Sequence, residues 1–230
     1  MASVLVTATD LTRRYGQGEA TVHALAGVTV GFPAGQFTAI MGPSGSGKST
    51  LMHLLAGLDR PTSGSVVLDG TELSRLDDKR LTDVRRDKVG FIFQSFNLLP
   101  VLSAQENIEL PLSIAGRKPD RAWMDSLIAT VGLGDRLRHR PAELSGGQQQ
   151  RVAVARALAS RPRVVFADEP TGNLDSKTSA EVLELLRRCV DEFGQTIVMV
   201  THDARAASYA DRLLELEDGV VVRDGVPAGV

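Results

Sequence analysis

Short apolar runs alternate with stretches of helical spacing through most of the chain. The runs that read as buried strands cover residues 37–41, 89–93, 163–167 and 196–200. Apolar positions recur at helical spacing over 51–58, 148–159 and 180–193, with stop signals at Gly57 and Gly194. Strands that alternate with helices predict an α/β fold, in which a parallel sheet is covered on both faces.

The ends and the middle of the chain do not follow this alternation of strands and helices. Short strands are predicted over 3–8, 22–32 and 66–68, and a hairpin over 213–222 that turns at 218–219. From about residue 103 to 138 the pattern is helical, with interruptions at Pro111, Gly116 and Pro119. Residues 95–160 are therefore expected to form a mainly helical subdomain that stands out from the sheet.

Composition sets broad limits on the function. The 230 residues are 43% hydrophobic, enough for one large domain or a domain with a subdomain, and the net charge of −2 gives no general attraction to nucleic acid. Cys189 is the only cysteine, so no intrachain disulfide can form, and its helical spacing predicts a core position. The first residues lack a signal-peptide pattern, and no run approaches the ~18 apolar residues of a membrane span. We therefore expect a cytoplasmic protein that reaches any membrane through a partner.

The strand at 37–41 leads directly into a glycine-rich string that fits the phosphate-loop pattern G-x-x-x-x-G-K-[ST]. Glycines let the backbone N–H groups surround a triphosphate, and the following helix adds its dipole. Lys48 is expected to reach the β- and γ-phosphates, and the Ser49 hydroxyl to bind Mg²⁺. The predicted contacts are Gly42, Pro43, Ser44, Gly45, Ser46, Gly47, Lys48, Ser49 and Thr50. A plain Gly/Ser turn is the disfavoured alternative, because Lys and Ser stand where the mechanism needs them.

A second candidate site lies where the strand at 163–167 ends in Asp168 and Glu169. Acids at the carboxyl end of such a strand lie in the crevice where α/β sheets bind ligands. Asp168 is a candidate Mg²⁺ ligand, and Glu169 is a candidate base for the attacking water. Helix-capping acids at a solvated strand end are the alternative.

A third unusual string, Leu-Ser-Gly-Gly-Gln, covers residues 144–148. A serine and two glycines at the start of a helix can bind an anion through backbone N–H groups and a hydroxyl. The alternative is a serine cap followed by flexible glycines.

Together and in this order, these three strings resemble those of the ATP-binding-cassette (ABC) ATPases, over nearly the whole chain. The resemblance implies a P-loop NTPase fold of the ABC type, with a mixed sheet core, an antiparallel β subdomain and a helical subdomain. We expect residues 1–230 to form one such domain, divided into 1–94 with 161–230 for the core and β subdomain, and 95–160 for the helical part.

The resemblance also implies roles for single residues. Gln94 is similar to the glutamine that senses Mg²⁺ and the membrane partner, and His202 to the histidine at the γ-phosphate. Tyr15 is similar to the aromatic residue that stacks on adenine, although a half-buried core tyrosine is the alternative. The implied catalytic set is Lys48, Gln94, Glu169 and His202; the metal ligands are Ser49, Gln94 and Asp168; the further ATP contacts are Tyr15, Ser145, Gly146, Gly147, Gln148 and Asp175.

The family pairs two chains head to tail, so that Ser145 and Gly147 of one copy contact the ATP held by Lys48 of the other. Segments 57–64, 91–100 and 170–176 are similar to the macrolide-exporter and lipoprotein-release branch, which implies ATP hydrolysis that powers a separate membrane permease. The protein is then expected to lie peripherally on the cytoplasmic face of the membrane.

Residues 94–101 are the expected permease contact, because four apolar residues would form an exposed cluster after Gln94. These residues are Phe96, Leu98, Leu99 and Val101. Packing within the helical subdomain is the alternative. A soluble ABC ATPase that acts on nucleic acid or ribosomes is the second functional hypothesis, but neither long coiled-coil insertions nor a basic stripe supports it, so no nucleic-acid partner is expected. A GTPase is disfavoured, because Asp87-Lys88-Val89-Gly90 has no accompanying base-reading motif.

Overall fold

The computed structural model describes residues 3–16 and 21–227, and its centre is a six-stranded sheet in the order β10-β9-β3-β8-β7-β6. The five strands from β9 to β6 are parallel, and β10 pairs antiparallel with β9. The strands are β3 (Phe37–Met41), β6 (Val89–Phe93), β7 (Val164–Asp168), β8 (Thr196–Val200), β9 (Arg212–Glu217) and β10 (Val220–Gly225). The continuous apolar runs in β3, β6, β7 and β8 fit strands that are covered on both faces.

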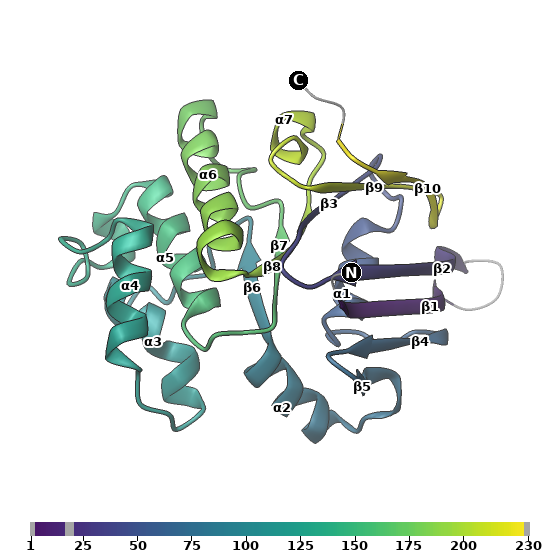
Figure 1. Cartoon of the computed structure of the whole chain (residues 1–230), viewed down its shortest axis with the longest axis horizontal. Helices are drawn as coiled ribbons and strands as arrows, with labels where there is room; N and C mark the ends of the chain where they lie inside the picture. Colours follow the sequence, from purple (N-terminus) through teal and green to yellow (C-terminus); the bar gives the residue numbers. More distant parts are fainter. Residues whose placement is uncertain (1–2, 17–20, 228–230) are drawn as a thin grey trace.

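A second, antiparallel sheet of four strands packs at one side of the central sheet, in the order β2-β1-β4-β5 (Figure 1). Its strands are β1 (Val4–Tyr15), β2 (Val22–Pro33), β4 (Ser63–Leu68) and β5 (Thr71–Glu72). Strand β1 is longer than the 3–8 predicted. Its register shifts between Ala8 and Leu11, and Asp10 within this interval has a left-handed backbone. This irregularity breaks the alternation of apolar and polar residues on which the prediction relied.

Helices α3 to α6 lie on the other side of the central sheet, whereas α1 lies beside the antiparallel sheet (Figure 1). In chain order, the helices are α1 (Lys48–Leu55), α2 (Asp78–Lys88), α3 (Ala104–Ile114), α4 (Arg121–Val131), α5 (Gly146–Leu158), α6 (Ser176–Phe193) and α7 (Ala204–Ala207), with the 3-10 turns η2 (Leu73–Arg75) and η3 (Pro141–Glu143). Helix α3 continues through Pro111, where an interruption was predicted, since this proline lies in its last turn. Helices α3, α4 and α5 all fall within 95–160, but the division of the chain at 94 and 160 stays a prediction.

Side chains of the central strands alternate between two cores. In β7, Val165 and Ala167 pack with the helical side, which includes α3 to α6, whereas Val164 and Phe166 pack against α1 and the antiparallel sheet. The expected coverage of both faces is confirmed, with a sheet in place of helices over much of one face. Cys189 on α6 is buried in the helical-side core, as predicted. In the described parts of the chain, no helix combines the length and the apolar character that a bilayer span requires.

Candidate active site

The glycine loop follows β3 and ends at the first residue of α1, as predicted. Gly42, Gly45 and Gly47 all have positive φ, at 148°, 80° and 100°. A Cβ on Gly42 would overlap the carbonyl oxygen of Leu216, and one on Gly47 that of Ala24. The path of the loop therefore requires glycine at 42 and 47 for space as well as for backbone conformation.

The start of α1 has the properties of an anion site. Its N-cap is Gly47, which has no side chain to cap the first N–H groups of the helix. Lys48 is buried, and its Nζ donates to the carbonyl oxygens of Gly42 at 2.9 Å and Pro43 at 2.7 Å. The loop borders a cavity of about 410 Å³, lined by Val22, Ala24, Ser44, Gly45, Gly47, Lys48, Ser49, Thr50, Glu169 and His202.

The acidic end of β7 faces the same region. The backbone of Glu169 is left-handed, with φ 44°, and its N–H donates to the Val200 carbonyl at 2.9 Å. This turn brings the Glu169 carboxylate within 3.0 Å of Nδ1 of His202, which follows β8. Burial raises the pKa of the Asp168 carboxyl, while the charges of His53 and Lys48 oppose the rise. Lys48, Asp168, Glu169 and His202, predicted from separate motifs, are thus neighbours.

Gln94 is held by a segment far away in the sequence. It follows Phe93, which pairs with Asp168 across the sheet. Its Nε2 donates to Oδ1 of Asn173 at 3.2 Å, and Nδ2 of Asn173 donates back to the Gln94 carbonyl at 3.1 Å. A Cβ on Gly172 would lie 2.7 Å from the Gln94 side-chain nitrogen, so the absence of a side chain there lets the two segments meet.

The string at 144–148 forms the start of α5. The Ser145 hydroxyl accepts from the Gln148 N–H at 3.3 Å, and the Gln148 side chain accepts from the Ser145 N–H at 2.9 Å. This capping box is the local structure that the alternative interpretation predicted. A Cβ on Gly147 would overlap Thr178 of α6, so that glycine also allows the two helices to approach.

Asp175 has a similar local role at the start of α6. Its carboxylate accepts from the Thr178 hydroxyl at 2.6 Å and from the Lys177 and Thr178 N–H groups at 3.0 Å each. These bonds, chiefly that of the Thr178 hydroxyl, lower the pKa of Asp175. Neither Asp175 nor the 144–148 string lines the cavity beside the glycine loop. Within the described part of a single chain, the two halves of the predicted site are separate.

Tyr15 ends β1 and is 40% exposed. Its hydroxyl donates to Asp59 at 2.9 Å, and the Arg13 guanidinium lies 4.5 Å from the ring centre. It does not line the loop cavity, and residues 17–20, which follow it closely, are outside the described parts. Its predicted contact with a base stays a prediction.

The apolar residues after Gln94 do not form one exposed cluster, which corrects part of the prediction. Leu98 packs against the helical-side core and Phe96 is half-buried, whereas Leu99 and Val101 are exposed. The loop is organised by Asn107, a buried residue of α3 whose amide bonds the backbone of Leu99 in both directions, at 2.8 and 3.1 Å.

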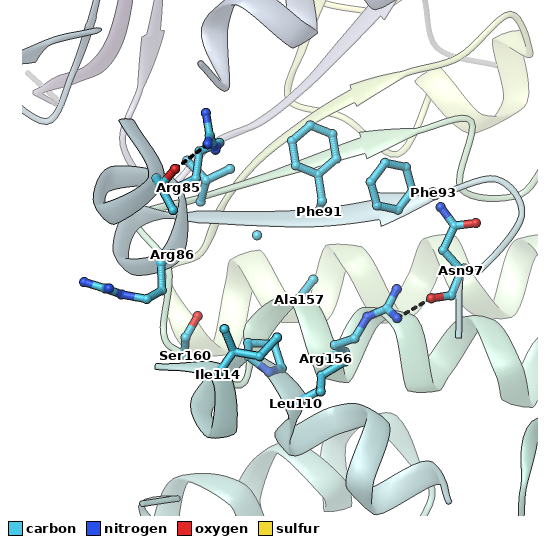
Figure 2. A pocket seen from close by; sticks show the side chains of 14 residues that line it. Arg85, Arg86, Phe91, Phe93, Asn97, Leu110, Ile114, Arg156, Ala157 and Ser160 are labelled. Carbon is cyan, nitrogen blue, oxygen red and sulfur yellow. Dashed lines mark hydrogen bonds between the residues drawn. The ribbon is translucent and has the colours of Figure 1, made fainter. Parts of the chain in front are cut away.

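A groove of about 450 Å³ lies next to this loop, and motif reasoning missed most of its residues (Figure 2). Phe91 and Phe93 of β6 form one wall, and Leu110 and Ile114 of α3 lie opposite. The full lining is Thr82, Arg85, Arg86, Val89, Gly90, Phe91, Phe93, Asn97, Leu110, Pro111, Ile114, Arg156, Ala157 and Ser160. Helix α2, which forms one side of the groove, was not predicted from the sequence. It is strongly polar, and Leu81 is its only buried residue.

A glycine loop between a strand and a helix, beside an acidic strand end of a mainly parallel sheet, defines a P-loop nucleotide triphosphatase. Comparison with known proteins narrows this class. The chain belongs to the ABC transporter family, whose model matches residues 25–172. It is accordingly an ATP-binding protein and an ATPase of the ABC type.

Individual relatives cover nearly the whole chain. It is 50% identical to the lipoprotein-releasing system ATP-binding protein LolD of Geobacter metallireducens, over 96% of this chain and 100% of the relative. It is 49% identical to the macrolide export ATP-binding/permease protein MacB of Marinobacter nauticus, over 96% of this chain but only 34% of that longer protein. It is similar to a solved dimer of the cassette MJ0796 of Methanocaldococcus jannaschii in a post-hydrolysis state with ADP and Pi, with a TM-score of 0.86, 44% identity, and coverage of 98% of this chain and 100% of that one.

Proposed function

We propose that this chain is the ATP-hydrolysing subunit of an exporter or lipoprotein-releasing system, and that it works as a homodimer attached to a separate membrane permease. The observation that carries the proposal is the separation of the glycine loop from the 144–148 string within one chain. A second copy, arranged head to tail, would supply Ser145 and Gly147 to the ATP held by the first. The similar cassette MJ0796 has been solved as a dimer with ADP and Pi, which supports a dimer for this chain.

On this proposal, the loop from Gly42 to Thr50 binds the phosphates through its N–H groups, and Lys48 exchanges its bonds to the loop carbonyls for phosphate oxygens. The oxygens of Ser49, Asp168 and Gln94 are of the kind that Mg²⁺ prefers, so these residues fit a magnesium site. Bound Mg²⁺ would offset the negative charge of the β- and γ-phosphates.

Glu169 then accepts the proton of the attacking water as the water oxygen bonds the γ-phosphorus and the bond between that phosphorus and the β–γ bridging oxygen breaks, which leaves ADP and phosphate. His202, which bonds the Glu169 carboxylate at 3.0 Å, holds that carboxylate in place and contacts the γ-phosphate. The Ser145 hydroxyl already accepts from the Gln148 N–H, so its own hydrogen is free to donate to a phosphate oxygen of the partner site. Tyr15 stacks on the adenine, and Asp175 stands at the same interface as Ser145.

The test replaces Glu169 by Gln, which keeps the shape of the side chain but removes the base. We expect ATP hydrolysis to fall by roughly 10²–10⁴-fold while ATP binding persists. Sedimentation with Mg-ATP should then show a stable dimer. Glu184→Gln, at an exposed position of α6, is the matched control and should retain normal turnover. A Glu169→Gln protein that stays monomeric with ATP and hydrolyses it normally would refute both the residue role and the dimer.

The permease contact is assigned to the groove between β6, α2, α3 and α5, next to residues 94–101. Its apolar walls and the arginines at 85 and 156, which form no ion pair among the described residues, suit a short amphipathic helix that carries an acidic residue. A protein attached in this way would lie peripherally on the cytoplasmic face of the membrane.

Ile114 is 74% exposed at this groove, and Val226 is equally exposed just after β10, the strand at the edge of the central sheet opposite β6. Ile114→Asp should therefore leave the isolated ATPase active but abolish co-purification of the permease, an integral protein to be identified by mass spectrometry. Val226→Asp is the matched control and should retain the complex. Equal loss of the complex in both variants would contradict the assignment of this groove.

A further inference from the structure

The side chain of Arg156, near the end of α5, binds two successive backbone carbonyls, and Figure 2 shows the bond to Asn97. Its Nη1 donates to the Asn97 oxygen at 2.6 Å, and its Nη2 donates to the Phe96 oxygen at 2.8 Å. One planar guanidinium thus fixes the orientation of two neighbouring peptide groups, which a single ammonium group would not do.

The backbone that Arg156 binds has an uncommon conformation. Phe96 and Asn97 are both left-handed, with φ of 60° and 51°, and neither is a glycine. The turn has internal bonds from the Phe96 N–H to the Phe93 carbonyl at 3.2 Å and from the Asn97 N–H to the Ser95 carbonyl at 2.6 Å. Non-glycine residues stay in this region only when their surroundings hold them there, and such residues cluster at functional sites.

The charge of Arg156 has no acidic partner within residues 3–16 and 21–227. Burial lowers the pKa of its guanidinium, which is the effect expected when water is removed from a cation. Arg86, which lines the same groove, instead pairs with Asp83 at 3.0 Å and Asp87 at 2.9 Å. In this chain, the bonding capacity of Arg156 is used on the turn after Gln94.

We infer that Arg156 is a positioning residue for Gln94, and that it ties the turn of residues 95–97 to the helix that presents Ser145. Helix α5 begins directly after Ser145, and eleven residues at about 1.5 Å each place Arg156 roughly 16 Å along the same rigid element. Beyond the turn, Gln94 bonds Asn173. A displacement of Asn97 at the groove is therefore transmitted both to Gln94 and to the far end of α5.

This inference rests on the proposed role of Gln94 in the reaction, and the experiment separates the two claims. Steady-state kinetics of the full chain are compared for Gln94→Ala, Arg156→Met and the double variant. We expect each single variant to lower kcat by about 10–100-fold, with the KM for ATP within threefold of the original, because misplacement by an ångström is enough for such a loss. The double variant should be no slower than the slower single variant, since both substitutions remove one function.

Arg151→Met is the matched control, because Arg151 lies on the same helix but donates to Glu181 and the Val131 carbonyl. It should keep kcat within threefold. Arg156→Lys keeps the positive charge and serves as a second variant in case Arg156→Met does not fold. In Arg156→Lys, the backbone amides of Phe96 and Asn97 should exchange hydrogen with solvent at least tenfold faster than in the original chain.

The outcomes are distinguishable. If Gln94→Ala hydrolyses ATP at the normal rate, the proposed role of Gln94 fails, and the positioning role of Arg156 fails with it. If Gln94→Ala is slow but Arg156→Met and Arg156→Lys keep normal kcat and normal exchange, only the inference about Arg156 is overturned. Losses that multiply in the double variant would also overturn it, because two independent functions would then be involved.

Discussion

Substitution of Gly42 by alanine tests whether the glycine loop is fixed by close contact with β9. A Cβ at this position would lie 2.7 Å from the Ser46 hydroxyl and would overlap the carbonyl oxygen of Leu216. The backbone oxygen cannot rotate away, so either the loop or β9 must move. The φ of 148° is itself a conformation that alanine rarely adopts.

Two contributions determine the expected loss of stability. Backbone strain contributes about 1–3 kcal/mol, and forcing a methyl group into a filled space contributes a further 1–3 kcal/mol. The sum of about 2–6 kcal/mol is a large part of the total stability of about 5–15 kcal/mol typical of a domain. Gly42→Ala should therefore be much less stable than the original chain and should also bind ATP more weakly.

Gly45 in the same loop is the control. Its φ is 80°, but within the described parts of the chain no heavy atom other than those of residues 44–46 lies within 4 Å of where its Cβ would be. Gly45→Ala should therefore lower the free energy of unfolding only by the cost of the left-handed backbone, about 1–2 kcal/mol. Urea unfolding of both variants without nucleotide measures the difference, and equal losses would show that the contact with Leu216 is not a constraint.

Two further predictions concern residues outside the loop. Asn107→Ala should cost about 1–3 kcal/mol in urea unfolding, because the Leu99 N–H loses its partner, whereas the exposed neighbour Gln105→Ala should cost less than about 0.5 kcal/mol. The pKa of Asp69 is lowered in the folded state, chiefly by its hydrogen bond with Lys88. The ionised carboxylate therefore stabilises the fold above pH 3.8, and this stabilisation is lost as the pH falls through the pKa of the folded state. Asp69→Asn should lose at most about 1 kcal/mol at neutral pH and become less sensitive to acid below about pH 4; an unchanged acid transition in urea titrations would contradict this.

The apolar strands were predictable because burial on both faces leaves a continuous hydrophobic run. Strands β3, β6 and β8 begin and end where the sequence indicates. The residues around the glycine loop were also predictable, since their types and spacing follow directly from phosphate chemistry. Helix α2 was not, because Leu81 is its only buried residue, and contacts such as that of Arg85 with the Gly57 carbonyl help to hold it.

Features that depend on contacts between distant segments were beyond the reach of sequence patterns. The pairing of Gln94 with Asn173 joins residues 79 positions apart, and no local periodicity encodes it. The groove is assembled from four elements, and its apolar walls come from β6 and α3, whose separate apolar patterns do not indicate that they share a surface. The serine cap at 145 was, by contrast, one of two alternatives that the sequence predicted, and only the geometry of α5 shows that the cap leaves the hydroxyl hydrogen free.

Because Cys189 is buried, cysteines introduced at the surface can be labelled selectively. The pKa of the Cys189 thiol is raised to about 12, chiefly by burial, so only roughly one molecule in 100,000 carries the reactive thiolate at pH 7. Maleimide dyes or spin labels should therefore attach almost exclusively to cysteines introduced at the surface, without prior removal of the native one. Two labels, one beside the glycine loop and one at the start of α5, would then report the approach of two subunits in an otherwise unaltered protein.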